Sequence, residues 1–285
     1  MPSSFWSNTI WYILLAVTSA VTMAFALKKS KYRKYTTAFA LAILGLLYFL
    51  EAILVILFHA YIYLPKIVND PFQDTVMGNY FSQVSIASTS VLIIVYGLSR
   101  VWYVFIAAVY CLIEELFLKL GIYRHDWYRT LYTFIGLMLL FWFVEICYKK
   151  ITASSKYIAR YIPLFLGTFA LAGNTIIMPL KVSKLQVFTI NIFGNFSKDH
   201  TTVSIIYEII LLNLLIILYN RRLYWVWRLA AFAILFLGQY ILHRTGIIYF
   251  REGWFSFVTV LELIGFYCWI ILHDYLLQQK PAASS

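Results

Sequence analysis

The chain has 285 residues, of which 62% are hydrophobic and 12% are charged. Soluble domains carry charge on roughly 25% of their residues, because a surface that faces water needs it. The composition therefore excludes an ordinary soluble domain and favours a chain that is solvated by lipid. The formal charge of +11 does not indicate nucleic-acid binding, because Lys and Arg fall in short clusters between apolar stretches, as in membrane proteins.

Apolar stretches of about 20 residues are long enough to cross the hydrocarbon core as helices. The sequence contains nine of them, and eight spans remain an alternative because two of the separating turns are very short. The first span is expected to be retained, since positive charge follows it instead of preceding it as in a signal peptide. We therefore predict an all-α, polytopic transmembrane helix bundle. Its spans cover residues 8–27, 36–64, 80–98, 101–121, 130–148, 161–179, 202–219, 223–243 and 254–276.

The distribution of basic residues predicts the orientation of this bundle. With nine spans, most Lys and Arg beside span ends fall on one side of the membrane, and the side rich in Lys and Arg is the cytoplasmic one. We expect a plasma-membrane protein with its N-terminus outside and its C-terminus in the cytoplasm. The basic residues on the predicted cytoplasmic side are Lys28, Lys29, Lys31, Arg33, Lys34, Arg100, Lys149, Lys150, Lys156, Arg160, Arg221, Arg222, Arg228 and Lys280.

The second half of the chain is similar to the first at an offset of 125 residues. Apolar helices resemble one another by chance, so the argument depends on shared Gly, Trp and polar positions. The aligned pairs are Trp102 with Trp227, Glu114 with Gln239, Lys119 with Arg244, Gly121 with Gly246 and, after a two-residue insertion, Trp127 with Trp254 and Trp142 with Trp269. We predict an N-terminal helix with its basic connection (residues 1–35), followed by two tandem four-helix repeats (residues 36–150 and 151–285).

The connection before the last span of each half contains a short motif. It reads G-I-Y-R-H-D-W-Y at residues 121–128 and G-I-I-Y-F-R-E-G-W-F at residues 246–255. With a Glu in the preceding helix, this turn resembles a small multipass membrane protein family of Gram-positive spore-forming bacteria, and each half is about as long as one such protein. The first copy departs from the pattern, because Asp126 stands where Gly253 does and two residues before it are missing. The resemblance implies a fold and a bacterial membrane location, and no catalytic residue.

A few acidic and amide side chains lie inside the predicted spans. Such groups are costly in hydrocarbon, so each must face protein or water. Most of them share a predicted depth in the outer half of the membrane, which predicts a polar cavity between the two repeats; the alternative is that they hydrogen-bond across helices as packing contacts. The predicted cavity residues are Glu51, Gln83, Glu114, Glu208, Gln239 and Glu262.

Two further acids are predicted to form ion pairs one helical turn away. Glu115 has Lys119 at i+4, and Glu145 has Lys149 at i+4, which is a favourable orientation on a helix. No metal, cofactor or catalytic residue is predicted, since the sequence has no HExxH, GxSxG, P-loop or dinucleotide motif.

Three functions are compatible with these observations. The first is a small-solute transporter or ligand-binding membrane protein, whose partners are the lipid bilayer and a solute in the polar site. The second is a structural, sensor or interaction protein that binds a membrane partner protein and transports nothing. The third is an intramembrane lipid-modifying enzyme with a carboxylate as general base; it lacks an evident nucleophile or metal, so an enzyme is the less favoured interpretation.

Overall fold

The computed structural model describes residues 5–153, 157–221 and 223–278. Within these residues, nine helical spans are long and apolar enough to cross a membrane. The chain is therefore an all-α, multi-pass membrane protein, as predicted. Lys156, Arg222 and Lys280, which entered the prediction of orientation, lie outside the described residues.

The chain divides into two compact units. Unit 1 contains the residues up to Tyr161 and the end of the chain from Leu277, and unit 2 contains Ile162–Leu276. The division predicted from the sequence, between residues 150 and 151, falls near the end of the fifth long helix.

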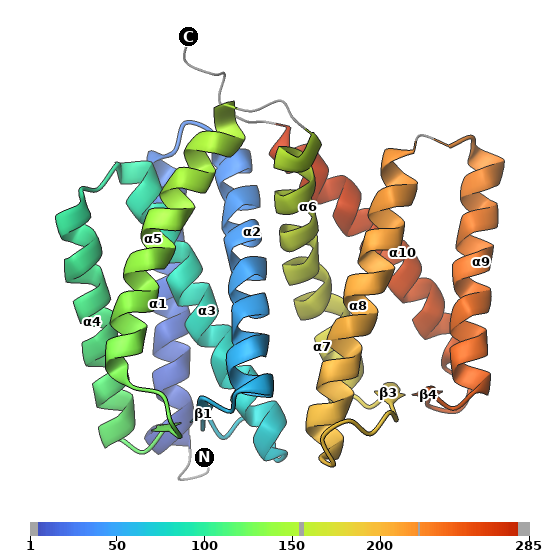
Figure 1. Ribbon diagram of the computed structural model, residues 1–285, viewed down its shortest axis with the longest axis horizontal. Helices are drawn as coiled ribbons and strands as arrows, with labels where there is room; N and C mark the ends of the chain where they lie inside the picture. The colour runs from blue at the N-terminus through green and yellow to red at the C-terminus, as the bar shows by residue number, and fades with distance from the viewer. Residues whose placement is uncertain (1–4, 154–156, 222, 279–285) are drawn as a thin grey trace. The chain divides into compact units, whose positions relative to one another are not determined.

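Unit 1 combines long helices with one pair of short strands (Figure 1). Helices α1 and α2 pack on α3, and α4 packs on α5. The two strands pair antiparallel, with Tyr61 opposite His125 and Tyr63 opposite Tyr123. The elements are η1 (Phe5–Thr9), α1 (Ile10–Lys29), α2 (Arg33–Glu51), η2 (Ala52–Leu57), β1 (Tyr61–Tyr63), α3 (Pro71–Tyr96), α4 (Arg100–Lys119), β2 (Tyr123–His125) and α5 (Thr130–Ala153), where η denotes a π-helical turn.

Unit 2 has the same kinds of element, with a second pair of strands. Its first span is continuous through three elements, α6, η3 and α7. The strands again pair antiparallel, with Gln186 opposite Phe250 and Phe188 opposite Ile248. The elements are α6 (Tyr157–Ala172, which begins before the unit boundary), η3 (Gly173–Ile177), α7 (Met178–Val182), β3 (Gln186–Phe188), α8 (Phe196–Asn220), α9 (Trp225–Arg244), β4 (Ile248–Phe250) and α10 (Phe255–Leu277).

The strands correct the prediction for the second span. This span was expected over residues 36–64, but it ends at Leu57. His59 then has a φ of 49°, a left-handed conformation that a helix does not tolerate, and the chain turns into β1. The sequence of β1 is Tyr-Ile-Tyr, which continues the apolar run, so hydropathy alone does not separate the strand from the helix.

Helix α3 begins earlier than predicted because its start is well capped. The Asp70 side chain accepts a hydrogen bond from the Gln73 backbone N–H at 2.8 Å, and Pro71 occupies the first turn, as is typical of helix N-termini. The connection predicted over residues 65–79 is therefore partly helical. Asp74 accepts backbone N–H groups from Lys66, Ile67 and Val68, which holds the preceding loop against the helix.

Helix α8 also begins earlier than predicted, at Phe196, with a capped start. The connection predicted over residues 180–201 is therefore shorter than expected. The Asn195 side chain accepts from the Lys198 backbone N–H at 3.1 Å, and Asp199 accepts from the Phe193 N–H at 2.6 Å. A capping side chain with an acid four residues later is common to both helix starts.

Strand β1 lies directly against α3. The Thr75 hydroxyl donates to the Tyr63 carbonyl oxygen at 3.1 Å. A Cβ atom on Gly78, one turn further along α3, would overlap the Tyr63 Cβ and lie 3.2 Å from the Pro65 Cδ. The absence of a side chain at Gly78 is therefore what allows the strand to approach the helix this closely.

We predict that Gly78→Ala destabilises the protein by about 1–3 kcal/mol, which is typical of overpacking. The added methyl group meets a strand Cβ and so requires the backbone to shift. Thermal unfolding of the full chain in detergent measures the effect. Gly238→Ala in α9 is the control, because a Cβ there meets nothing within 4 Å; it should unfold no earlier than wild type. Equal unfolding temperatures for the two variants would contradict the close contact.

Candidate functional site

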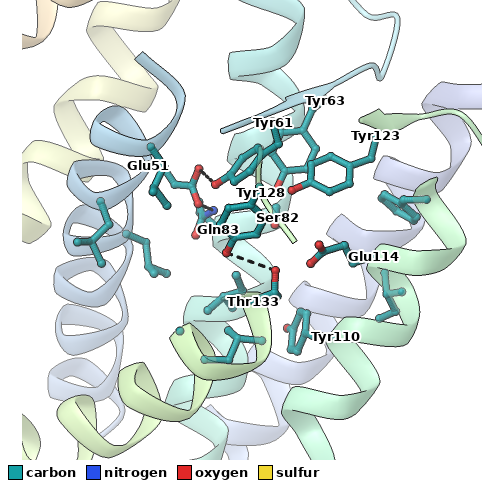
Figure 2. Close-up of a pocket in the computed structure, with 18 of the residues that line it drawn as sticks. Glu51, Tyr61, Tyr63, Ser82, Gln83, Tyr110, Glu114, Tyr123, Tyr128 and Thr133 are labelled. Carbon is teal, nitrogen blue, oxygen red and sulfur yellow. Dashed lines mark hydrogen bonds between the residues drawn. The ribbon is translucent and has the colours of Figure 1, made fainter. Parts of the chain in front are cut away.

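A pocket of about 180 Å³ lies within unit 1. Helices α1 to α5 and both strands contribute to its wall. Most of the wall is aliphatic or aromatic, and the polar groups are concentrated on a few side chains (Figure 2). The polar lining residues are Glu51, Tyr61, Tyr63, Ser82, Gln83, Tyr110, Glu114, Tyr123, Tyr128 and Thr133.

Glu51, the last residue of α2, is held by two donors from different elements. The Tyr61 hydroxyl of β1 donates to its Oε2 at 2.5 Å, and Gln83 Nε2 of α3 donates to its Oε1 at 2.7 Å. Gln83 Nε2 also donates to Asn79 Oδ1 at 3.0 Å. The Gln83 side chain is buried, and its Oε1 has no hydrogen-bond partner among the described residues.

Glu114, in the C-terminal part of α4, is paired with a histidine of β2. Its Oε1 lies 2.7 Å from His125 Nε2, and the two side chains are about one-tenth exposed. Figure 2 shows Glu51 and Glu114 on opposite sides of the pocket. The two carboxylates therefore border the same space from different helices.

The neighbouring acids have other roles. Glu115 Oε1 accepts the Thr130 hydroxyl at 2.5 Å, and no ion pair within 4.0 Å joins it to Lys119 among the described residues; that prediction was wrong. Glu115 is one residue from Glu114, so it points about 100° away around the helix. The predicted pair of Glu145 and Lys149 is confirmed, with 2.5 Å between Nζ and Oε1.

Four tyrosines of the strand pair and its following turn form one aromatic cluster over the pocket. The ring centroids of Tyr63 and Tyr123 are 4.7 Å apart, and those of Tyr61 and Tyr128 are 4.9 Å apart. Burial raises the pKa of Tyr61 and of Tyr123 well above the ordinary value, and raises the pKa of Tyr128 to about 12. All three phenols are therefore neutral at physiological pH, and all three line the pocket.

The composition of the wall selects for positive charge. Within the described part of the chain, the lining residues include two carboxylates and no Lys or Arg. Ring faces of tyrosine attract cations through their quadrupole, and the aliphatic residues can only accommodate apolar groups. The chemistry of this pocket fits a cation that carries an apolar body.

The structure divides the six predicted cavity residues between the units. Glu51, Gln83 and Glu114 line the pocket of unit 1. Glu208, Gln239 and Glu262 are buried in unit 2, where the Tyr207 hydroxyl donates to Glu262 Oε2 at 2.8 Å. One cavity shared by all six residues stays a prediction.

Among the described residues, no group of three or more His, Cys, Asp or Glu side chains is arranged to hold a metal ion.

Neither the tyrosine cluster nor the pairing of His125 with Glu114 was predicted from the sequence. Tyrosines near span ends are more often membrane-interface anchors, so their number alone does not indicate a pocket. The alternating Tyr-Ile-Tyr of β1 is a weak strand signal, but nothing in it predicts a partner strand about 60 residues later.

Comparisons with protein-family models, with curated proteins and with solved structures found no match for this chain.

We predict that Tyr61→Phe lowers the free energy of unfolding by about 1 kcal/mol. The change removes the donor to Glu51 Oε2, and an unpaired buried acceptor costs about 1–3 kcal/mol; the lower figure applies because Glu51 faces a pocket that water can enter. Thermal unfolding in detergent is the measurement. Tyr132→Phe, at a tyrosine that is 46% exposed, is the control and should leave stability unchanged. A loss of the same size in both variants would contradict a specific role for the Tyr61 hydroxyl.

Proposed function

We propose that this chain is an integral membrane protein that binds a small organic cation with an apolar body in the pocket of unit 1. The observation that carries the proposal is the composition of the wall. Glu51 and Glu114 border a space whose other lining residues are mostly aromatic or aliphatic, and the described lining residues include no lysine or arginine. The ligand class is an alkyl or aryl ammonium compound.

The energetics favour a cation over a neutral molecule of the same shape. Two unit charges 4 Å apart attract by about 4 kcal/mol at an effective dielectric constant of about 20. A tyrosine ring adds about 0.5–2 kcal/mol when the cation is desolvated. An anion meets repulsion from an ionised carboxylate, and the described lining residues include no Lys or Arg to offset this repulsion.

We further propose that binding serves transport of the cation across the plasma membrane. Intramembrane carboxylates commonly mark a path for ions or solutes. The basic residues beside span ends favour an N-terminus outside the cell and a C-terminus in the cytoplasm. Uptake of the bound cation into liposomes that contain the purified chain tests this step separately from binding.

Tandem duplication is a second part of the proposal, and a constant spacing of elements supports it. The aspartates that hold the loops before α3 and α8, Asp74 and Asp199, are 125 residues apart. So are His59 and Lys184, which both have a left-handed φ. The starts of corresponding elements have the same spacing: Tyr61 and Gln186, Pro71 and Phe196, Arg100 and Trp225, Tyr123 and Ile248, and Thr130 and Phe255. The element starts align at a constant offset of 125 residues, so they do not need the two-residue insertion that the pairing of Trp127 with Trp254 requires.

An interaction or scaffold protein is the second candidate, because both acids already have partners. Glu51 accepts from Tyr61 and Gln83, and Glu114 is paired with His125. Such bonds also occur as packing contacts between helices. Under this alternative the pocket has no ligand, and Glu114 matters for stability alone.

We predict that benzyltrimethylammonium raises the unfolding temperature of the purified chain, because a ligand that binds only the folded state stabilises it. The uncharged analogue neopentylbenzene and the anion benzenesulfonate should bind at least about 10-fold more weakly, which corresponds to about 1.4 kcal/mol. Isothermal titration in lipid nanodiscs measures the three affinities.

Two matched variants locate the site. Glu114→Gln should weaken binding of benzyltrimethylammonium at least about 10-fold, because it removes one carboxylate charge while keeping the shape. Glu115→Gln changes the adjacent residue on the same helix, which is not among the lining residues, and should leave the affinity unchanged. Equal affinities in wild type and Glu114→Gln, or no binding of any ammonium compound, would favour the scaffold alternative.

A further inference from the structure

Unit 2 contains a second group of buried polar side chains, separate from the pocket of unit 1. The six residues come from five elements, and we refer to them as the unit 2 polar cluster. Each is at most 8% exposed. The cluster consists of Lys181 of α7, Gln186 of β3, His200 and Glu208 of α8, Gln239 of α9 and Glu262 of α10.

Most of these residues have polar atoms without a hydrogen-bond partner among the described residues. The unpartnered acceptors are Glu208 Oε1, Glu262 Oε1 and Gln239 Oε1, and the unpartnered donors include Gln186 Nε2 and Gln239 Nε2. The Gln186 and Gln239 amides lie close enough to the Glu262 carboxylate to interact with it, but the atoms do not meet the distance and angle of a hydrogen bond. Buried polar groups in folded proteins are nearly always hydrogen-bonded, so this concentration points to a bound partner.

The histidine contributes a further donor. His200 Nδ1 accepts a hydrogen bond from the Phe188 backbone N–H at 3.1 Å. Since Nδ1 is the acceptor, the neutral ring carries its hydrogen on Nε2. His200 Nε2 is buried and has no partner among the described residues, so it is a donor that faces the interior.

The surroundings keep the two carboxylates accessible to a bound partner. A Cβ atom on Gly173, in the π-helical turn η3, would lie 3.4 Å from Glu208 Oε1, so the glycine leaves room beside this acid. Glu262 uses Oε2 to accept from Tyr207 at 2.8 Å, which leaves Oε1 available. Lys181 interacts electrostatically with Glu208, but no ion pair within 4.0 Å joins them among the described ion pairs.

We propose that the unit 2 polar cluster is a hydrated proton-binding site, in which bound water bridges the unpartnered atoms and Glu208 and Glu262 share one added proton. Water is the partner that fits, because it donates to the three free oxygens and accepts from the three free N–H groups. A metal cation such as Na⁺ would bind the oxygens and leave the donors without partners.

The charge of the cluster also favours one proton. Two carboxylates and one ammonium group leave one net negative charge, which a single proton neutralises. Among the described residues, the titratable groups around the pair are Lys181, His200 and Tyr207. The facing residues of β3, α9 and η3 do not titrate; they are Gln186, Gln239 and Gly173. Hydronium from bulk water transfers the proton to a carboxylate oxygen, an O–H bond forms, and a water molecule remains.

Infrared difference spectroscopy of the full chain in lipid, recorded between two pH values, tests this proposal. A protonated carboxylic acid has a C=O stretching band that shifts in D₂O. We expect wild type to show such a band on acidification, and Glu262→Gln and Glu208→Gln to lose it or shift it. Glu252→Gln is the control, because Glu252 lies in an exposed turn of the same unit; it should retain the band.

Three results would overturn the proposal. The first is a wild-type spectrum without a deuterium-sensitive carboxylic acid band at any pH at which the protein stays folded. The second is a band that persists unchanged in both glutamine variants. The third is a band that disappears when Na⁺ replaces K⁺ at constant pH, which would assign the site to a metal cation. If one variant does not fold, the other variant and the wild-type deuterium shift still decide the question. Binding of ammonium compounds by unit 1 is a separate measurement and does not affect this result.

Discussion

The rest of the structure depends on the high free energy of an unsatisfied polar group inside a membrane. A carboxylate without partners in hydrocarbon costs several kcal/mol, so each acid in a span must meet a donor from the protein or from water. In unit 1 these donors come largely from the strand pair: Tyr61 of β1 reaches Glu51, and His125 of β2 reaches Glu114. The two short strands therefore determine where acids are tolerated in the surrounding helices.

The strand pair itself depends on contacts that are distant in sequence. The Tyr12 hydroxyl of α1 donates to the Ile122 carbonyl oxygen at 2.6 Å, and Asn8 donates to the Leu64 carbonyl oxygen at 2.8 Å. The first helix thus satisfies backbone groups at the edges of both strands. Irregular backbone near a membrane is tolerated only where protein or water satisfies it, and this gives α1 a structural role within unit 1.

The sequence predicted the parts of the fold that follow from hydropathy alone. All nine spans were expected, because the length of an apolar run can be read from the sequence and compared with the length that crosses the hydrocarbon core. The strands were not expected, because Tyr61–Tyr63 is as apolar as the helix before it and pairs with residues about 60 positions away. Glu51 and Glu114 were identified as buried acids, but their partners Tyr61 and His125 could not be, since these contacts depend on how the strands are paired in space.

Both units must pair polar groups that are buried in the membrane, but they do so with different side chains. If the units are tandem copies as proposed, comparing corresponding positions shows which side chains have changed. Gln83 corresponds to Glu208 and Glu114 corresponds to Gln239, with a spacing of 125 residues in both pairs. The amide and the carboxylate have therefore exchanged helices between the two units. At the same spacing Leu137, which lines the pocket of unit 1, corresponds to Glu262. An amide both donates and accepts hydrogen bonds, whereas a carboxylate only accepts, so the exchange keeps polarity at both positions and moves the charge. Ile176 stands where Glu51 does, so each unit contains two acids, placed on different helices. Unit 1 has an aromatic pocket that suits an organic cation, whereas unit 2 has Lys181 near its acids, which suits water and a proton.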